Sequence, residues 1–240
     1  MMPSPYTSEQ SLEDAAAAAN MLGVKIDTVP IGPAMNAFDE MLLDHFKGSK
    51  AGITEENIQS RSRGLTLMAL SNKLGAMVLS TGNKSEMSVG YATLYGDMCG
   101  GYSVLKDVYK MTVFELSKWR NKLRPNGALG PEGAVMPERI ISKPPSAELK
   151  PDQKDEDTLP PYEELDAILH GLIEDEANVQ EIASRGFDID VVMRIWQMLD
   201  RAEYKRRQAP PGVKIGHRAF GRDRRYPITN SYKASYQIKN

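Results

Sequence analysis

Apolar residues recur at helical spacing along most of the chain. In the segment 34–46, for example, Met35, Phe38 and Met41 lie three residues apart, and Phe46 continues the same face. This spacing, with the capping and stop residues around it, predicts helices over residues 11–22, 34–46, 54–74, 112–123, 163–174 and 189–207. Ser11 and Thr112 are placed to cap two of these helices.

Two short apolar runs predict strands, over residues 24–29 and 76–79. The second is continuously apolar, as in a strand buried on both faces of a parallel sheet. Strands alternating with helices indicate a layered α/β domain. Two strands cannot form a stable doubly wound sheet, however. The βα unit that carries the phosphate loop in many nucleotide-binding sheets is missing, and residues 1–4 resemble the end of another strand. We therefore expect the chain to begin inside a domain.

Polar and proline-rich segments separate the later elements. Residues 81–102 are rich in Gly, Ser, Thr and Asn, and they are too many for a simple turn. Residues 125–137 and 142–164 are predicted to be a linker and an extended loop. The tail from residue 209 onward is predicted to wrap the surface of the domain.

Composition limits the classes of function. The 240 residues carry a net charge of −2, which gives no electrostatic reason to expect nucleic acid or a membrane as a partner. No apolar run approaches the ~20 residues of a membrane span. The basic and aromatic residues 218–226 are better explained by a surface or dimer contact than by nucleic-acid binding.

The rare reactive side chains suggest no metal site or thiol chemistry. Cys99 is the only cysteine, so no internal disulfide can form, which fits a cytoplasmic location. Packing explains this cysteine better than catalysis does. The three histidines, His45, His170 and His217, show no zinc-ligand spacing.

Four stretches of sequence are specific in their order and spacing. They are MPSPYTSEQSLEDA near the start, STGNKSEMSVGYATLYGDMCGGYSVLKDVYK at residues 80–110, SKPPSAELKPDQKDEDTLPPYEELD at residues 142–166 and AEYKRRQAPPGVKI near the end. Together they resemble the synthetase domain of the glutamine-dependent NAD synthetases, over essentially the whole chain. TGNKSE, YGD and KPPSAEL argue against other adenylating amide-forming enzymes of the same fold, such as GMP synthetase.

The resemblance implies a fold and an activity. The fold is a doubly wound parallel α/β sheet of the ATP-pyrophosphatase type (adenine nucleotide alpha hydrolase-like, Rossmann-like), truncated here at its N-terminal edge and helical in its C-terminal part. Residues 1–207 would form a partial NAD synthetase domain and residues 208–240 the wrapping tail. The activity is amidation of deamido-NAD to NAD, in which ATP with magnesium first adenylates the nicotinate carboxylate and ammonia then displaces AMP.

The sequence also departs from the family pattern. The family's phosphate loop, SGG-x-DS, does not occur in these 240 residues, and neither does the glutaminase domain that supplies ammonia from glutamine. Backbone N–H groups of such a loop cradle phosphate. We therefore expect this chain alone to be inactive. The alternative is a non-catalytic dinucleotide-binding or assembly subunit. Family members usually form homodimers, so we expect a homodimer or higher oligomer.

The resemblance also assigns the ATP-binding residues. Thr81 and Ser146 match hydroxyls that contact ATP, and Lys110 matches a lysine that contacts its phosphates and assists catalysis. A lysine is a suitable point charge for a transferring phosphoryl group. Without the family, Thr81 could equally cap a helix, Ser146 could be a turn serine and Lys110 an exposed loop lysine.

The remaining assignments concern deamido-NAD. The matching positions are Asn57, Arg61, Glu86, Tyr91, Ala92, Thr93, Leu94 and Lys205. Glu86 also matches a magnesium ligand, and a carboxylate suits that hard cation. Leu94 stands where the ammonia-dependent enzymes have a lysine, which favours the glutamine-dependent type. Alternatively, Glu86 complements a helix dipole, Asn57 and Arg61 lie on a solvated helix face, and Lys205 is a favourable cation at a helix end.

Overall fold

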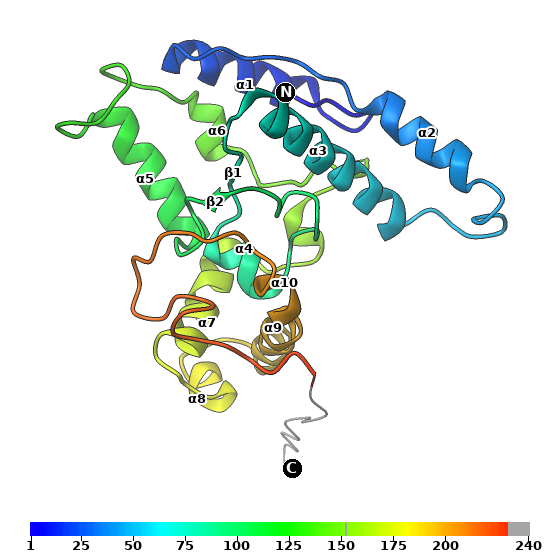
Figure 1. The fold of residues 1–240 in the computed structure, drawn as a ribbon. Helices are drawn as coiled ribbons and strands as arrows, with labels where there is room; N and C mark the ends of the chain where they lie inside the picture. Colours follow the sequence, from blue (N-terminus) through cyan, green and yellow to red (C-terminus); the bar gives the residue numbers. More distant parts are fainter. Residues whose placement is uncertain (152, 230–240) are drawn as a thin grey trace.

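Short helices and two very short strands make up the computed structural model, which describes residues 1–151 and 153–229 (Figure 1). The elements are α1 (Glu9–Leu22), α2 (Gly32–Leu42), α3 (Ile53–Leu74), β1 (Leu79–Ser80), α4 (Lys84–Val89), β2 (Tyr102–Ser103), α5 (Lys110–Lys122), α6 (Glu138–Ser142), a 3-10 turn (Asp155–Asp157), α7 (Tyr162–Ile173), α8 (Val179–Ala183), α9 (Ile189–Arg201) and α10 (Glu203–Arg206). Helices α1 to α3 lie at one end and α7 to α9 at the other, with the strands between them. In the described part of the chain, no helix is both long and apolar enough to span a bilayer.

The predicted helices exist, but several boundary details were wrong, among them the end of α2, which lies at Leu42 and not at Phe46. The cap of α1 is Ser8, whose hydroxyl accepts from the Ser11 N–H at 3.2 Å, so Ser11 lies inside the helix. Helix α5 begins at Lys110 after an extended Tyr109, so Thr112 is a first-turn residue rather than the cap. The predicted helix 189–207 is divided at Ala202 into α9 and α10.

The strand prediction for residues 76–79 was also largely wrong. Only Leu79 and Ser80 form a strand, which pairs in parallel with Tyr102 and Ser103. The Met77 side chain is 68% exposed and Leu79 is 54% exposed, so this run is not buried on both faces. An apolar run predicts burial only where another layer covers it, and the described residues leave these side chains uncovered.

Residues 24–29 are extended but do not form a regular strand, contrary to the prediction. The N–H of Val29 donates to the Met1 carbonyl at 2.8 Å, and that of Ile31 donates to the Pro3 carbonyl at 3.0 Å. Bonds from alternate residues are the pattern of a parallel ladder, as expected if residues 1–4 run like the end of a strand. No backbone hydrogen bond in the described residues joins this pair to β1. The doubly wound sheet is therefore not seen; what is present is a helical α/β arrangement with a small parallel sheet.

The main hydrophobic core lies in the C-terminal helices rather than around the sheet. It joins the apolar faces of α7, α8 and α9, and its fully buried members include Leu165, Ile168, Ile182 and Ile195. Phe220 of the tail packs into the same cluster. The tail also meets the sheet, because the Ser103 N–H donates to the Pro211 carbonyl at 2.8 Å. The tail thus contacts both the C-terminal core and the small sheet, and the rest of the predicted tail, 230–240, lies outside the described residues.

A buried ion cluster holds the N-terminus of α4. The Lys84 ammonium lies 2.8 Å from Asp107 and 2.6 Å from Glu174, and it donates to the Arg218 carbonyl of the tail at 3.0 Å. The Lys84 side chain is only 1% exposed. Two carboxylates and a carbonyl compensate for its removal from water.

Replacing Lys84 by Met should lower the free energy of unfolding by about 3 kcal/mol, because Asp107 and Glu174 would remain charged without their cation. Chemical denaturation measures this. The control is Lys25→Met, which breaks an exposed pair with Asp27 and should cost less than about 1 kcal/mol. Equal effects of the two substitutions would contradict the structural role of the cluster.

Candidate functional site

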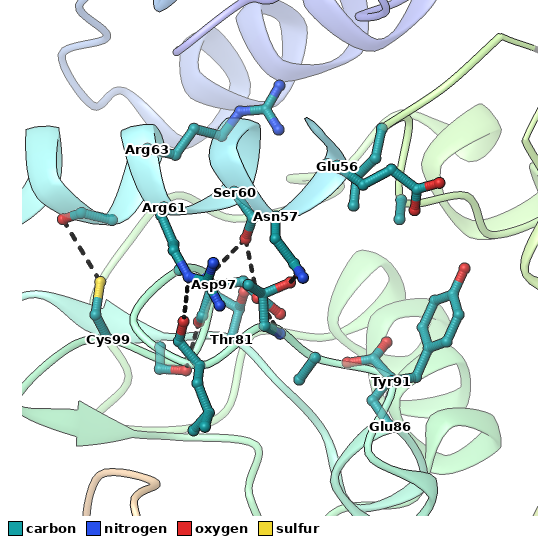
Figure 2. Close-up of a pocket in the computed structure, with 18 of the residues that line it drawn as sticks. Glu56, Asn57, Ser60, Arg61, Arg63, Thr81, Glu86, Tyr91, Asp97 and Cys99 are labelled. Atoms are coloured by element: carbon teal, nitrogen blue, oxygen red, sulfur yellow. Dashed lines mark hydrogen bonds between the residues drawn. The ribbon is translucent and has the colours of Figure 1, made fainter. Parts of the chain in front are cut away.

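One cavity of about 690 Å³ is lined by every residue that the sequence assigned to the site. Its walls come from the first half of α3, the loop between β1 and α4, residues 90–97, and the segment 145–155 (Figure 2). The assigned residues among them are Asn57, Arg61, Thr81, Glu86, Tyr91, Ala92, Thr93, Leu94, Lys110, Ser146 and Lys205. Segments far apart in the chain therefore meet around a single space.

The α3 wall presents polar side chains toward the segment 90–97 (Figure 2). Asn57 and Arg61 lie four residues apart, on one face of the helix. The Asn57 amide oxygen accepts from the Thr93 hydroxyl at 3.2 Å, and the Arg61 Nε donates to the Leu94 carbonyl at 3.1 Å. Both contacts leave further hydrogen-bonding groups of Asn57 and Arg61 for a ligand.

Glu86 forms part of the capping box of α4 and also lines the cavity. One carboxylate oxygen accepts the Asn83 N–H at 3.2 Å, while the Asn83 side chain accepts the Glu86 N–H at 3.0 Å, which forms a capping box. The other oxygen accepts from the Lys110 ammonium at 3.0 Å. The two charged side chains are about one-fifth exposed, so a ligand in the cavity can reach them.

A backbone hydrogen bond to α4 fixes the position of Lys110. Its N–H donates to the Ser85 hydroxyl at 2.9 Å, and that hydroxyl in turn donates to Asp166. The Lys110 ammonium lies 5.1 Å from the centre of the Tyr162 ring, within range of a cation–π contact. The lysine is thus oriented toward Glu86 instead of being a free surface chain.

The two hydroxyl residues differ in their surroundings. Thr81 is exposed in the loop that follows β1. Ser146 is partly buried, and its hydroxyl donates to the Gln153 carbonyl at 2.5 Å while accepting the Glu148 N–H at 3.2 Å. Contact with a ligand would therefore require Ser146 to share or exchange one of these bonds.

Lys205 shapes the segment that precedes Thr93. Its ammonium donates to the carbonyls of Gly90 and Ala92 at 2.7 and 2.6 Å. Burial lowers the pKa of Lys205, and the nearby Asp97 partly opposes that shift. Lys205 consequently has a structural role in the cavity wall in addition to its assigned one.

Asp97 belongs to the site but received no role from sequence reasoning. Its carboxylate accepts the Thr93 N–H at 2.7 Å and the Ser60 hydroxyl at 3.2 Å (Figure 2). Burial raises the pKa of Asp97 above its usual range, although these hydrogen bonds oppose the shift. The sequence does carry a signal for this residue, because Asp97 is the aspartate of the YGD motif that supports the family resemblance.

Asp155 is the second residue that sequence reasoning missed. One of its oxygens accepts from the Tyr162 hydroxyl at 2.8 Å, and the other is buried without a hydrogen-bond partner in the described part of the chain. Burial is also the main reason why the pKa of Tyr91 and that of Tyr162 are raised, with Asp155 contributing to both. Asp155 therefore adds a buried carboxylate to this wall of the cavity.

The donor set suits magnesium only in part. Glu86 and Asp155 both line the cavity and offer the hard oxygen atoms that Mg²⁺ prefers. Among residues 1–151 and 153–229, however, no three His, Cys, Asp or Glu side chains gather as a metal site. Because Mg²⁺ usually takes one or two carboxylates and completes its shell with water and substrate phosphates, this partial set is compatible with a nucleotide-bound ion.

Parallel extended segments, interleaved helices and a cavity beyond the end of β1 are the arrangement of an α/β domain with a binding site at the carboxyl end of its sheet. The family profile described as NAD synthase matches residues 1–209. The chain therefore belongs to the NAD synthase family.

Known relatives agree with this assignment. The glutamine-dependent NAD(+) synthetase of Acinetobacter baylyi is 53% identical over 97% of this chain and 42% of its own length. The Thermotoga maritima enzyme is 52% identical over 97% of this chain and 39% of its own length. The solved Acinetobacter baumannii enzyme, in complex with ADP, has a TM-score of 0.56 and 49% identity over 98% of this chain and 40% of that one. This chain thus spans about two-fifths of the length of these relatives.

The raised pKa of Asp97 predicts a particular pH dependence of stability. The folded chain binds the proton of the Asp97 carboxyl more tightly than the unfolded chain does. Protonated Asp97 therefore contributes to the free energy of unfolding below the ordinary pKa of ~4, and this contribution is lost as pH rises through the raised pKa. Relative to an Asp97→Asn variant, the wild-type free energy of unfolding should therefore fall as pH rises through that window.

Denaturation curves at a series of pH values measure this difference. Asp44→Asn, which removes an exposed carboxylate, provides the baseline. A difference between wild type and Asp97→Asn that stays flat, or that grows with pH, would contradict the predicted sign.

Proposed function

We propose that this chain forms the substrate-binding part of an NAD synthetase, which amidates deamido-NAD to NAD with ATP, magnesium and ammonia obtained from glutamine. The observation that carries the proposal is the convergence of all eleven assigned side chains on one cavity. Proximity along the chain does not explain this convergence, because the residues span positions 57 to 205. Because this chain matches only about two-fifths of the relatives' length, we expect the whole reaction to need further residues from outside the matched part.

The cavity offers distinct contacts for the two substrates. The amide of Asn57 and the guanidinium of Arg61 would bind deamido-NAD from α3, opposite the wall formed by residues 91–94. Thr81, Lys110 and Ser146 would bind ATP, with Lys110 placed to stabilise negative charge on the ATP phosphates while the adenylyl group is transferred. Glu86 would hold magnesium between these regions, and the ion would supply neutralisation of phosphate charge.

In the proposed reaction, the nicotinate carboxylate of deamido-NAD attacks the α-phosphate of ATP and pyrophosphate leaves. Ammonia then attacks the activated carbonyl carbon, and AMP leaves with the bond electrons to give the amide. This chain's residues orient the two substrates so that the reacting groups meet, which removes much of the entropic barrier. The likeness to glutamine-dependent synthetases does not favour the alternative of a non-catalytic subunit.

Asn57→Ala should weaken deamido-NAD binding by about tenfold, since it removes a hydrogen-bonding group of the cavity wall. Isothermal titration of the purified chain measures this. The matched control is Asn72→Ala, which removes an exposed amide from the far part of α3. The assigned role would be wrong if the two substitutions had the same effect.

The purified chain by itself should form no NAD from deamido-NAD, ATP, magnesium and ammonia, because its sequence contains no SGG-x-DS loop. A chromatographic assay of NAD, run beside a full-length glutamine-dependent enzyme, measures the rate. Comparable turnover by the chain alone would show that the loop is dispensable. Deamido-NAD binding without turnover would agree with the proposal, whereas an absence of binding would contradict it.

A further inference from the structure

The segment 143–149 forms one wall of the cavity but is anchored outside it. Pro145, Ser146, Ala147 and Leu149 line the cavity. Between Pro145 and Leu149, Glu148 is the residue that does not line the cavity, and its side chain lies instead toward the N-terminus of α1. Because its side chain points away from the cavity, Glu148 can hold this wall in place without contacting a ligand.

Three donors of the α1 terminus surround the Glu148 carboxylate. It accepts the Ser8 N–H at 3.2 Å, the Ser8 hydroxyl at 2.9 Å and the Ser11 hydroxyl at 2.6 Å. The free N–H groups at a helix N-terminus favour an anion at this place. The Lys143 ammonium completes the cluster at 3.1 Å from Glu148. Charge-assisted hydrogen bonds of this kind are about twice as strong as neutral ones.

The ionised form of Glu148 is favoured in this position. Burial alone would raise the pKa of Glu148, but the hydrogen bonds from Ser11, Ser8 and Lys143 outweigh it and lower the pKa below its usual range. The carboxylate is therefore charged, and able to hold all of these donors, near neutral pH.

The backbone of Glu148 shows that this contact constrains the chain. Its φ of 49° lies in the left-handed region, which is unfavourable for a residue other than glycine. That conformation directs the Glu148 side chain toward α1 while Ala147 and Leu149 face the cavity. A second attachment, from the Gln59 amide to the Leu149 carbonyl at 3.0 Å, holds the other side of the segment to α3.

We propose that Glu148 is a positioning residue, which binds the N-terminus of α1 and thereby places Ser146 and its neighbours at the cavity. The KPPSAEL motif thus contains two kinds of residue: Ser146 faces the cavity, and Glu148 anchors the segment. The consequence for ligand affinity rests on the proposed function, whereas the anchoring itself does not.

Hydrogen exchange of the full chain tests the anchoring directly. In Glu148→Ala, the amide protons of Ser8 and Leu149 should exchange at least about tenfold faster than in wild type, because the carboxylate that holds the two segments together is gone. Glu148→Gly removes the same carboxylate and also relieves the left-handed backbone, so it should increase exchange as well. Glu156→Gln, an exposed charge change in the following turn, should leave both amides unchanged.

Titration of the same variants with deamido-NAD and with ATP supplies the functional measurement. Glu148→Ala and Glu148→Gly should bind ATP about tenfold more weakly while their thermal midpoints stay close to that of wild type, which separates positioning from a general loss of stability. Unchanged exchange at Ser8 and Leu149, or unchanged ATP affinity despite faster exchange, would overturn the proposal. Failure of the wild-type chain to bind either nucleotide would refute the proposed function, while the exchange result would still decide the anchoring.

Discussion

The cavity depends on the fixed position of α4, a helix of six residues that is clamped at both ends. At its N-terminus, the Lys84 ammonium is buried between Asp107 and Glu174. At its C-terminus, the buried Arg206 guanidinium donates to the Ser88 carbonyl at 2.8 Å, and Lys205 donates to the Gly90 carbonyl at 2.7 Å. So short a helix has little stability of its own, so these tertiary contacts must hold it.

The clamp explains why side chains from distant segments share one site. Glu86 projects from α4, and Ser85 of the same helix receives the Lys110 N–H. The segment that follows α4 continues into residues 91–94. The tail and α10 both contact this helix, because Lys84 donates to the Arg218 carbonyl and Arg206 donates to the Ser88 carbonyl. The Arg206 guanidinium also lies 4.7 Å from the centre of the Phe220 ring of the tail. Buried charges are costly unless fully paired, so loss of one partner in these contacts would be strongly unfavourable.

Sequence reasoning succeeded where local chemistry decides the outcome. Helix α3 ends at Gly75, which adopts a φ of 63° as glycine does at helix ends, and this end was predicted. The grouping of site residues followed from the family motifs rather than from periodicity. Spacing alone could show that Asn57 and Arg61 share a face, but not that they face Thr93 and Leu94.

The wrong predictions concern features that depend on contacts between residues far apart in the sequence. The runs 24–29 and 76–79 have strand-like composition, yet strand formation needs a partner at hydrogen-bonding distance, and composition does not supply one. Ser8 and Ser11 are both suitable caps, and the choice between them follows from the backbone, which is extended at Ser8. The sequence did not predict Glu148 as an anchor, because Ser8 lies 140 residues and Ser11 137 residues away along the chain.

Several assigned residues have structural contacts that are compatible with the roles proposed for them. Glu86 and Lys110 neutralise each other at 3.0 Å in this structure. Under the proposed function, ATP phosphates attract Lys110 and magnesium attracts Glu86. Either ligand alone would leave one member of the pair without its counter-charge in a partly buried wall, which is unfavourable. Bound together, they exchange one ion pair for two charge-matched contacts. Under the proposed function, the pair would therefore favour joint binding of nucleotide and cation over binding of either one separately.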